Sequence, residues 1–223
     1  MDPQPGASPS HRRTATVAVL GLAAYLAAAV WAREISLEGP ALIWFPPAAV
    51  AIAICFFRPR LVWVVLVAEL ISTPVVMGLG EEYGLALLIV NSVGLALAYA
   101  LGAWVMRRLA LDPRLRTLED LAVLALGVGA AAATATVVGV AVQWWADLIQ
   151  TDELLRSAAL FWVGDIVGAA CLLPAILICA EGIVRHGRIR LADDAPVRHR
   201  ARFAAELLAP AVIGAGVMAI GQQ

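Results

Sequence analysis

The sequence predicts an all-α fold, a polytopic transmembrane helical bundle. Three observations predict it: 62% of the 223 residues are hydrophobic, only 15% are charged, and the apolar residues form long continuous runs. A soluble domain is usually about half apolar and about a quarter charged. The excess apolar surface must therefore face lipid. Because the runs do not alternate with polar residues, they disfavour a transmembrane β-barrel.

Seven runs come near the ~20 residues that a helix needs to cross a ~30 Å hydrocarbon layer. They cover residues 14–32, 41–57, 61–79, 85–105, 118–145, 158–180 and 203–220. Thr117 and Asp120 predict a capping box at the start of the fifth run. We expect residues 1–13, which are rich in proline and serine, to form a disordered cytoplasmic tail, and residues 14–223 to form the membrane domain.

The arginines predict the orientation of the chain, since cytoplasmic loops of membrane proteins carry an excess of basic residues. One set of alternate loops contains Arg12, Arg13, Arg58, Arg60, Arg107, Arg108, Arg114, Arg116, Arg185, Arg188, Arg190, Arg198, Arg200 and Arg202. The other set contains only Arg33 and Arg156, together with most of the acidic loop residues. We therefore expect a multi-pass protein of the bacterial plasma (inner) membrane with a cytoplasmic N-terminus.

Three polar residues inside the predicted helices are candidates for function. Glu69 lies near the middle of the third run, and Asn91 and Asp165 lie slightly towards the outer side of their runs. A carboxyl at mid-bilayer costs ~2.5–3.5 kcal/mol on insertion scales, so it should face a partner or a cavity. Two interpretations stay open: a buried polar clamp that orders the bundle, or the floor of a pocket that opens to the outside.

Two adjacent prolines, Pro46 and Pro47, predict a broken helix at similar depth. Proline has no amide hydrogen, so the carbonyls of Leu42 and Ile43 lose their helical partners. Such groups are tolerated at membrane depth only against protein or a wet cavity. We expect residues 41–46 to be irregular and to line a wet cavity or another part of the protein, or else to form a kink that a neighbouring side chain fills.

These features together suggest one water-accessible cavity in the outer half of the bundle. We expect it to be bounded by Trp44, Pro46, Pro47, Asn91, Trp162 and Asp165.

Small residues recur at four-residue spacing on three of the predicted helices. They are Gly94, Ala98 and Gly102; Gly127, Ala131, Ala135 and Gly139, followed by Gln143; and Gly164 and Gly168. Such stripes let helix backbones approach closely. We expect them to pack inside one bundle, with a homodimer face as the alternative.

Several of these segments resemble a known family. The run Trp44–Ala51 (WFPPAAVA) resembles the W-x-P-P-x-G/A-x-A start of a helix in the first class of membrane-associated sensor (MASE) domains. The run Phe161–Gly168 (FWVGDIVG), followed by Pro174, resembles that family's W-x-G-D-x-x-G motif. Asn91 also matches an asparagine of the family. The resemblance covers about residues 40–183, and Glu69 departs from it, since an asparagine is more usual there.

The resemblance implies a sensory input module that detects a small ligand or membrane cue. Such modules pass the signal to a cytoplasmic output domain or partner, a histidine kinase or diguanylate cyclase, that this chain does not contain. They have about eight helices, so the seven runs suggest that an eighth is missing. The ligand-binding or signalling candidates are Trp44, Pro46, Pro47, Glu69, Asn91, Trp162 and Asp165.

Other classes of function are disfavoured. The histidines His11, His186 and His199 lie outside the apolar runs, no lysine is present, and Cys55, Cys171 and Cys179 have no metal-ligand spacing. We therefore expect no catalytic residues, no metal, no cofactor and no nucleic-acid partner. The alternative function is a small membrane transporter or substrate-capture protein, because broken helices with intramembrane carboxylates also suit transport.

Overall fold

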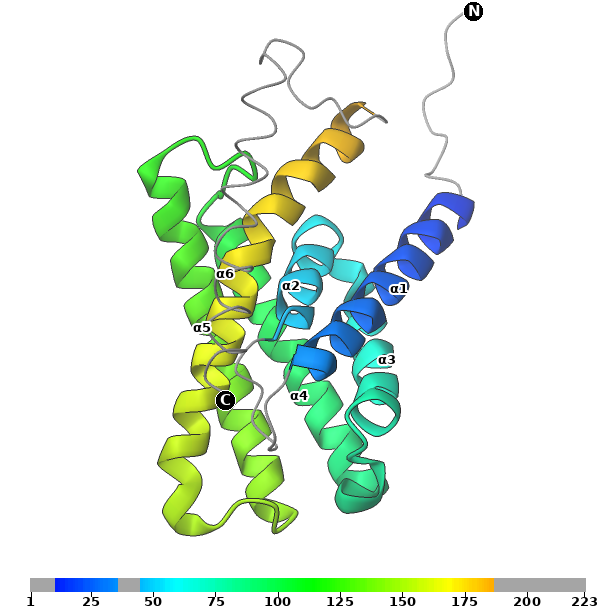
Figure 1. Ribbon diagram of the computed structural model, residues 1–223. Coiled ribbons are helices and arrows are strands. Elements are labelled where there is room, and N and C mark those ends of the chain that lie inside the picture. The colour runs from blue at the N-terminus through cyan, green and yellow to red at the C-terminus, as the bar shows by residue number, and fades with distance from the viewer. Residues whose placement is uncertain (1–10, 36–44, 187–223) are drawn as a thin grey trace, which may run out of the picture.

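The computed structural model describes residues 11–35 and 45–186, and in that part of the chain every regular element is helical (Figure 1). The predicted all-α fold is therefore confirmed. The six α-helices are α1 (His11–Ile35), α2 (Pro47–Phe57), α3 (Val62–Ile71), α4 (Gly80–Arg108), α5 (Leu118–Trp145) and α6 (Leu154–His186). The predicted count of seven is not matched by these six. The seventh predicted run, 203–220, falls outside the described residues.

Five helical stretches are long and apolar enough to cross a membrane. They are Thr14–Glu34, Pro59–Val76, Gly80–Arg108, Leu118–Trp145 and Thr151–Glu181. The chain is thus a multi-pass membrane protein. Helix α2, with 11 residues, is too short to be among them, so the second predicted run, 41–57, has no spanning helix in the described residues.

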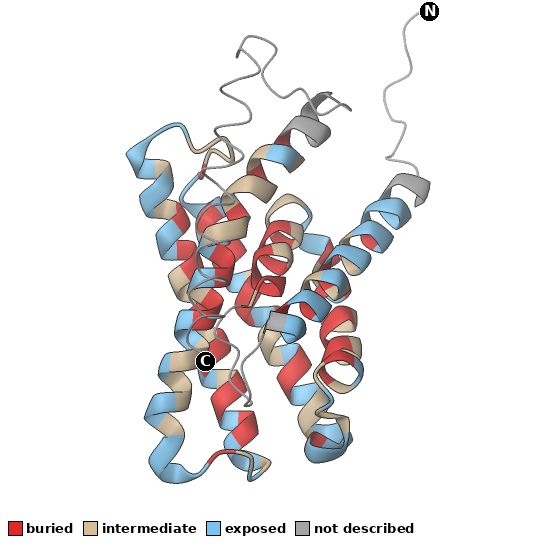
Figure 2. Ribbon diagram, in the orientation of Figure 1, coloured by how far each residue is buried: buried red, intermediate tan, exposed pale blue. Residues whose placement is uncertain are grey.

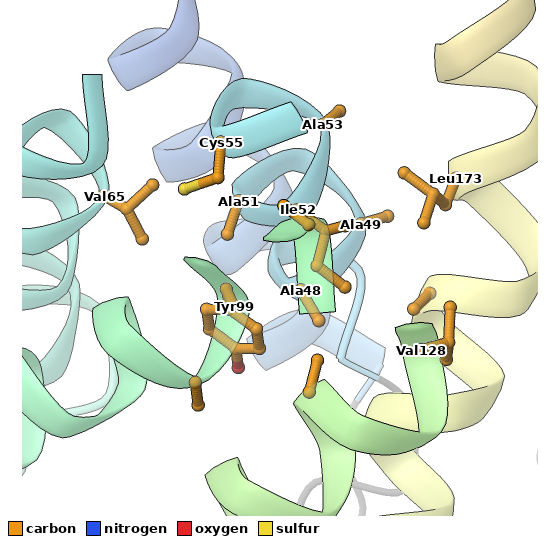
Figure 3. Close-up of a cluster of buried hydrophobic side chains, with 14 of the residues drawn as sticks. Ala48, Ala49, Ala51, Ile52, Ala53, Cys55, Val65, Tyr99, Val128 and Leu173 are labelled. Atoms are coloured by element: carbon orange, nitrogen blue, oxygen red, sulfur yellow. The ribbon is translucent and has the colours of Figure 1, made fainter. Parts of the chain in front are cut away.

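Helix α2 lies in the centre of the bundle, where it packs against α1, α4 and α6 (Figure 1). Its alanines are nearly all buried, and their small side chains let the surrounding helices approach closely. Figure 3 shows this core, in which Ala48 and Ile52 of α2 lie among Tyr99 of α4, Val128 of α5 and Leu173 of α6. The faces turned away from α2 are exposed (Figure 2) and carry large apolar side chains suited to lipid.

The local sequence explains where the helices begin. The predicted capping box is confirmed, because Thr117 Oγ1 accepts a hydrogen bond from the Asp120 amide (3.1 Å) while the Asp120 carboxylate accepts one from the Thr117 amide (3.0 Å). Helix α4 bends at Gly84, whose φ of 61° lies in the left-handed region that favours glycine. The regular part of α4 therefore begins at Leu85, as predicted.

The small-residue stripes pack inside the bundle, as predicted. Helices α4 and α5 meet where Gly102 faces Gly127. A methyl group at position 102 would lie only 2.6 Å from the Gly127 carbonyl oxygen and 2.7 Å from the Ala131 β-carbon. Ala131, Ala135, Gly139 and Gln143 of the same stripe are all buried.

We predict that Gly102→Ala destabilises the bundle by ~1–3 kcal/mol, the usual cost of overpacking. Gly129→Ala is the matched control, because nothing lies within 4 Å of a methyl group built there on α5. The free energy of unfolding of both purified variants would be measured in detergent against a denaturant gradient. Equal stability of the two variants would contradict the close α4–α5 contact.

Candidate ligand-binding site

Helix α3 does not continue through the third predicted run, which was expected to be helical over 61–79. It ends at Ile71 and passes into a π-helical turn, Ser72–Val76. The cause is Pro74, which has no amide hydrogen to donate to the preceding turn. The widened turn closes with the Met77 amide donating to the Ser72 carbonyl (2.9 Å).

The widened turn is held from outside by Arg33, near the end of α1. Arg33 Nη1 donates a hydrogen bond to the Val76 carbonyl oxygen (2.6 Å). Val76 is the last residue of the π-turn, and the arginine side chain supplies a hydrogen-bond donor to its carbonyl. Because a guanidinium has five N–H donors, this single bond leaves others available to a ligand.

A cavity of about 340 Å³ lies beside this turn. Its lining residues come from α1, the segment before α2, α3 with its π-turn, and α4 to α6. They are Arg33, Phe45, Glu69, Ser72, Thr73, Met77, Leu79, Tyr83, Asn91, Leu95, Gly139, Gln143 and Phe161. Most of them belong to the half of the bundle that holds the α3–α4 and α5–α6 connections (Figure 1).

Glu69 lines the cavity and is 98% buried, with an exposed fraction of 2%. The hydroxyl of Tyr25, a fully buried residue of α1, donates a hydrogen bond to Glu69 Oε1. This bond joins α1 to α3 across the wall of the cavity. Among the described residues, no arginine lies within ion-pair distance of the Glu69 carboxyl.

Other buried polar side chains surround the same cavity. Asn91 is 5% exposed, Ser72 is 2% exposed and Thr73 is 5% exposed, and all three line the cavity. Gln143 Oε1 is buried and has no hydrogen-bond partner among the described residues. Buried polar groups are normally hydrogen-bonded, so such a cluster calls for a water or a ligand.

The segment before α2 connects the cavity to α6. Phe45 lines the cavity and is not helical, because Pro46 and Pro47 follow it and have no amide hydrogens. Its own amide donates a hydrogen bond to the Gly164 carbonyl oxygen of α6 (3.2 Å). One turn later, a methyl group at Gly168 would lie 2.9 Å from the Phe45 amide nitrogen and closer still to its carbonyl. Glycine is therefore required at position 168.

Asp165 lies between α6 and α4. It is 5% exposed, and its Oδ2 accepts a hydrogen bond from the hydroxyl of the buried Tyr99 (3.5 Å). Asp165 is not among the residues that line the cavity. Each of the two intramembrane carboxyls thus pairs with a tyrosine hydroxyl on another helix.

The cavity beside the π-turn is lined by only some of the residues that the sequence grouped together. Glu69 and Asn91 line the cavity, whereas Asp165, Pro46 and Pro47 are buried beside it without lining it. Trp162 is 46% exposed, and it is not a lining residue either. Trp44 lies outside the described residues. Of the six residues expected to bound one outer cavity, the described part of the structure places only Asn91 on its wall.

Sequence reasoning missed several lining residues, among them Arg33, Phe45, Ser72 and Thr73. Two signals could have found them. Ser72 and Thr73 are adjacent polar residues that precede Pro74 inside an apolar run. Arg33 is one of only two arginines predicted to lie in the otherwise acidic set of loops.

Comparisons with known proteins agree with this architecture. The MASE1 family matches residues 15–219, nearly the whole chain. No curated protein and no solved structure matches the chain. MASE1 is a family of membrane-associated sensor domains that serve as sensory input rather than catalysis. With its apolar helices and buried polar cavity, the chain belongs to the MASE1 family of membrane sensor domains.

Proposed function

We propose that this protein is the sensory input module of a bacterial signalling system and that the cavity beside the π-turn binds its small ligand. The observation that carries this proposal is the cluster of buried polar residues on the cavity wall, in which Gln143 Oε1 has no hydrogen-bond partner among the described residues. A sensor needs an incompletely satisfied site that a ligand can complete. Membership of a sensor family supports the same conclusion.

The distribution of charge supports an orientation with the cavity towards the outside. Arg58, Arg60, Arg107 and Arg108 belong to the end of the bundle where α1 begins and α6 ends. The opposite end, nearer to the cavity, has acidic residues such as Glu81 and Asp152. By the positive-inside rule the first end is cytoplasmic. The ligand would then enter from the periplasmic side of the inner membrane.

Two contacts provide a route from the cavity to the cytoplasm. The Tyr25–Glu69 hydrogen bond links the cavity wall to α1, and the Phe45–Gly164 hydrogen bond links it to α6. Both helices extend to the proposed cytoplasmic end (Figure 1). A ligand that binds one arrangement of these contacts better than another would shift their equilibrium. The output would be a cytoplasmic catalytic domain or a separate partner protein.

The orientation predicts a specific pattern of labelling by a membrane-impermeant maleimide. In a background with Cys55, Cys171 and Cys179 replaced by serine, we expect Asp152→Cys to react in intact spheroplasts. Arg60→Cys should react only after permeabilisation, because η1 (Pro59–Leu61) joins α2 to α3 at the opposite end of the bundle from η3 (Thr151–Glu153). The reverse pattern would place the cavity on the cytoplasmic side and rule out a periplasmic ligand.

The route through α6 predicts that Gly168→Ala abolishes signalling, because the added methyl group pushes the Phe45 backbone away from α6. The variant would replace the chromosomal gene, and its transcript profile would be compared with those of the wild type and a deletion strain. We expect the profile of the deletion strain at unchanged membrane abundance.

Gly129→Ala on α5 is the matched control and should retain the wild-type profile, since its methyl group meets no neighbour. A Gly168→Ala strain with the wild-type profile would contradict the coupling of Phe45 to α6. Uptake of a solute that is lost in the deletion strain, with no change in transcripts, would instead favour a transporter.

A further inference from the structure

The cavity wall carries one acidic side chain, Glu69, and one basic side chain, Arg33, and the fold holds them apart. Tyr25 contacts Glu69, and Arg33 contacts Val76. Tyr25 and Arg33 are eight residues apart on α1, which corresponds to ~12 Å along a helix that rises 1.5 Å per residue. Glu69 and Arg33 therefore line the cavity at different depths, and Arg33 is the one nearer to the end of α1.

Neither group has a counter-ion of its own. Among the described residues, the Glu69 carboxyl has no arginine, and the Arg33 guanidinium has no carboxylate, within ion-pair distance. Glu69 is buried in the membrane interior, where an ionised group is costly unless it is paired, whereas Arg33 is exposed at the end of α1. A ligand that brought both missing counter-ions would be selected over one that brought only one.

The cavity lining also offers apolar surface to a ligand. Phe45, Leu95 and Phe161 contribute apolar side chains to it, while Ser72 and Asn91 contribute groups that can form hydrogen bonds. Aromatic faces also favour a nearby ammonium group. The lining thus combines a carboxyl, neutral polar groups, apolar surface and a guanidinium.

We propose that the cavity binds a zwitterion whose ammonium and anionic groups are separated by an apolar chain, with the ammonium at Glu69 and the anionic group at Arg33. This inference rests on the proposed function, because it names the ligand class of the same site. A simple amine carries only a positive charge, so the guanidinium of Arg33 would repel it and nothing in the ligand would pair with Arg33. A simple carboxylate would leave Glu69 without a counter-ion.

The test uses the purified full chain in nanodiscs of phosphatidylcholine and phosphatidylglycerol, with 6-aminohexanoate as the probe. Hexylamine lacks the carboxylate, hexanoate lacks the ammonium, and glycine has both charges close together. A ligand that binds only the folded state raises the unfolding temperature. We expect 6-aminohexanoate to raise it, and the three analogues to give no shift at equal concentration. An equal shift with hexylamine, hexanoate or glycine overturns the proposed ligand class.

Two variants assign the charges. Glu69→Gln and Arg33→Gln should each weaken binding of 6-aminohexanoate at least ten-fold, which corresponds to ~1.4 kcal/mol. Arg156→Gln is the matched control, since Arg156 is exposed at the same end of the bundle but does not line the cavity. If Glu69→Gln fails to accumulate in the membrane, the comparison of Arg33→Gln with Arg33→Lys tests the charge assignment instead. Lysine keeps the positive charge, so Arg33→Lys should keep most of the affinity for 6-aminohexanoate. Unchanged affinity in Arg33→Gln overturns the proposal.

The source of the zwitterion is tested by adding phosphatidylethanolamine to the nanodiscs. A rise in unfolding temperature that Arg33→Gln abolishes would show that a headgroup with its ammonium and phosphate only two carbons apart binds, which overturns the proposed separation of the charges. The lack of such a rise would assign a free zwitterion. Absence of any shift with 6-aminohexanoate in both kinds of nanodisc overturns this inference. The proposed function would still stand if Gly168→Ala reproduces the deletion phenotype, so the two failures are distinguishable.

Discussion

The structure depends on one constraint: a backbone group freed from helical hydrogen bonding inside a membrane must find its partner within the protein. Proline removes backbone donors near the cavity, at Pro46 with Pro47 and at Pro74, and again at Pro174 inside α6. At the first place the adjacent Phe45 amide is bound by a carbonyl of α6, and at the second the Val76 carbonyl is bound by Arg33 of α1. These two hydrogen bonds connect α1 and α6, the first and last helices of the described residues, to the region around the cavity.

The interior carboxyls follow a related logic. Glu69 and Asp165 lie on α3 and α6, and each accepts a hydrogen bond from a buried tyrosine, Tyr25 or Tyr99, on a different helix. A tyrosine hydroxyl can donate to a carboxyl without adding a second charge to a dry interior. Of the two, only Glu69 also reaches the cavity, so the resting partner of Glu69 and a ligand would compete for the same group.

The sequence predicted the fold class, the capping box at Thr117 and the burial of Glu69, Asn91 and Asp165, because run length, local spacing and intramembrane polarity decide them. It did not predict which of these residues share a cavity. Depth in the membrane can be counted along a helix, but the rotation of that helix depends on packing against neighbours. The rotation of α6 about its axis exposes Trp162 and turns Asp165 towards Tyr99. The π-turn at Pro74 was missed because the third run was recognised by its hydropathy, and hydropathy does not register a missing amide.

The shortness of α2 has an electrical consequence. Its 11 residues extend only ~16 Å, about half of a ~30 Å hydrocarbon layer. Phe45, the residue before the Pro46–Pro47 break at which α2 starts, lines the cavity. When water fills that cavity, the membrane potential falls mainly across the part of the bundle that stays dry. Groups at the inner end of the cavity would then experience the voltage of the cell as well as the composition of its surroundings.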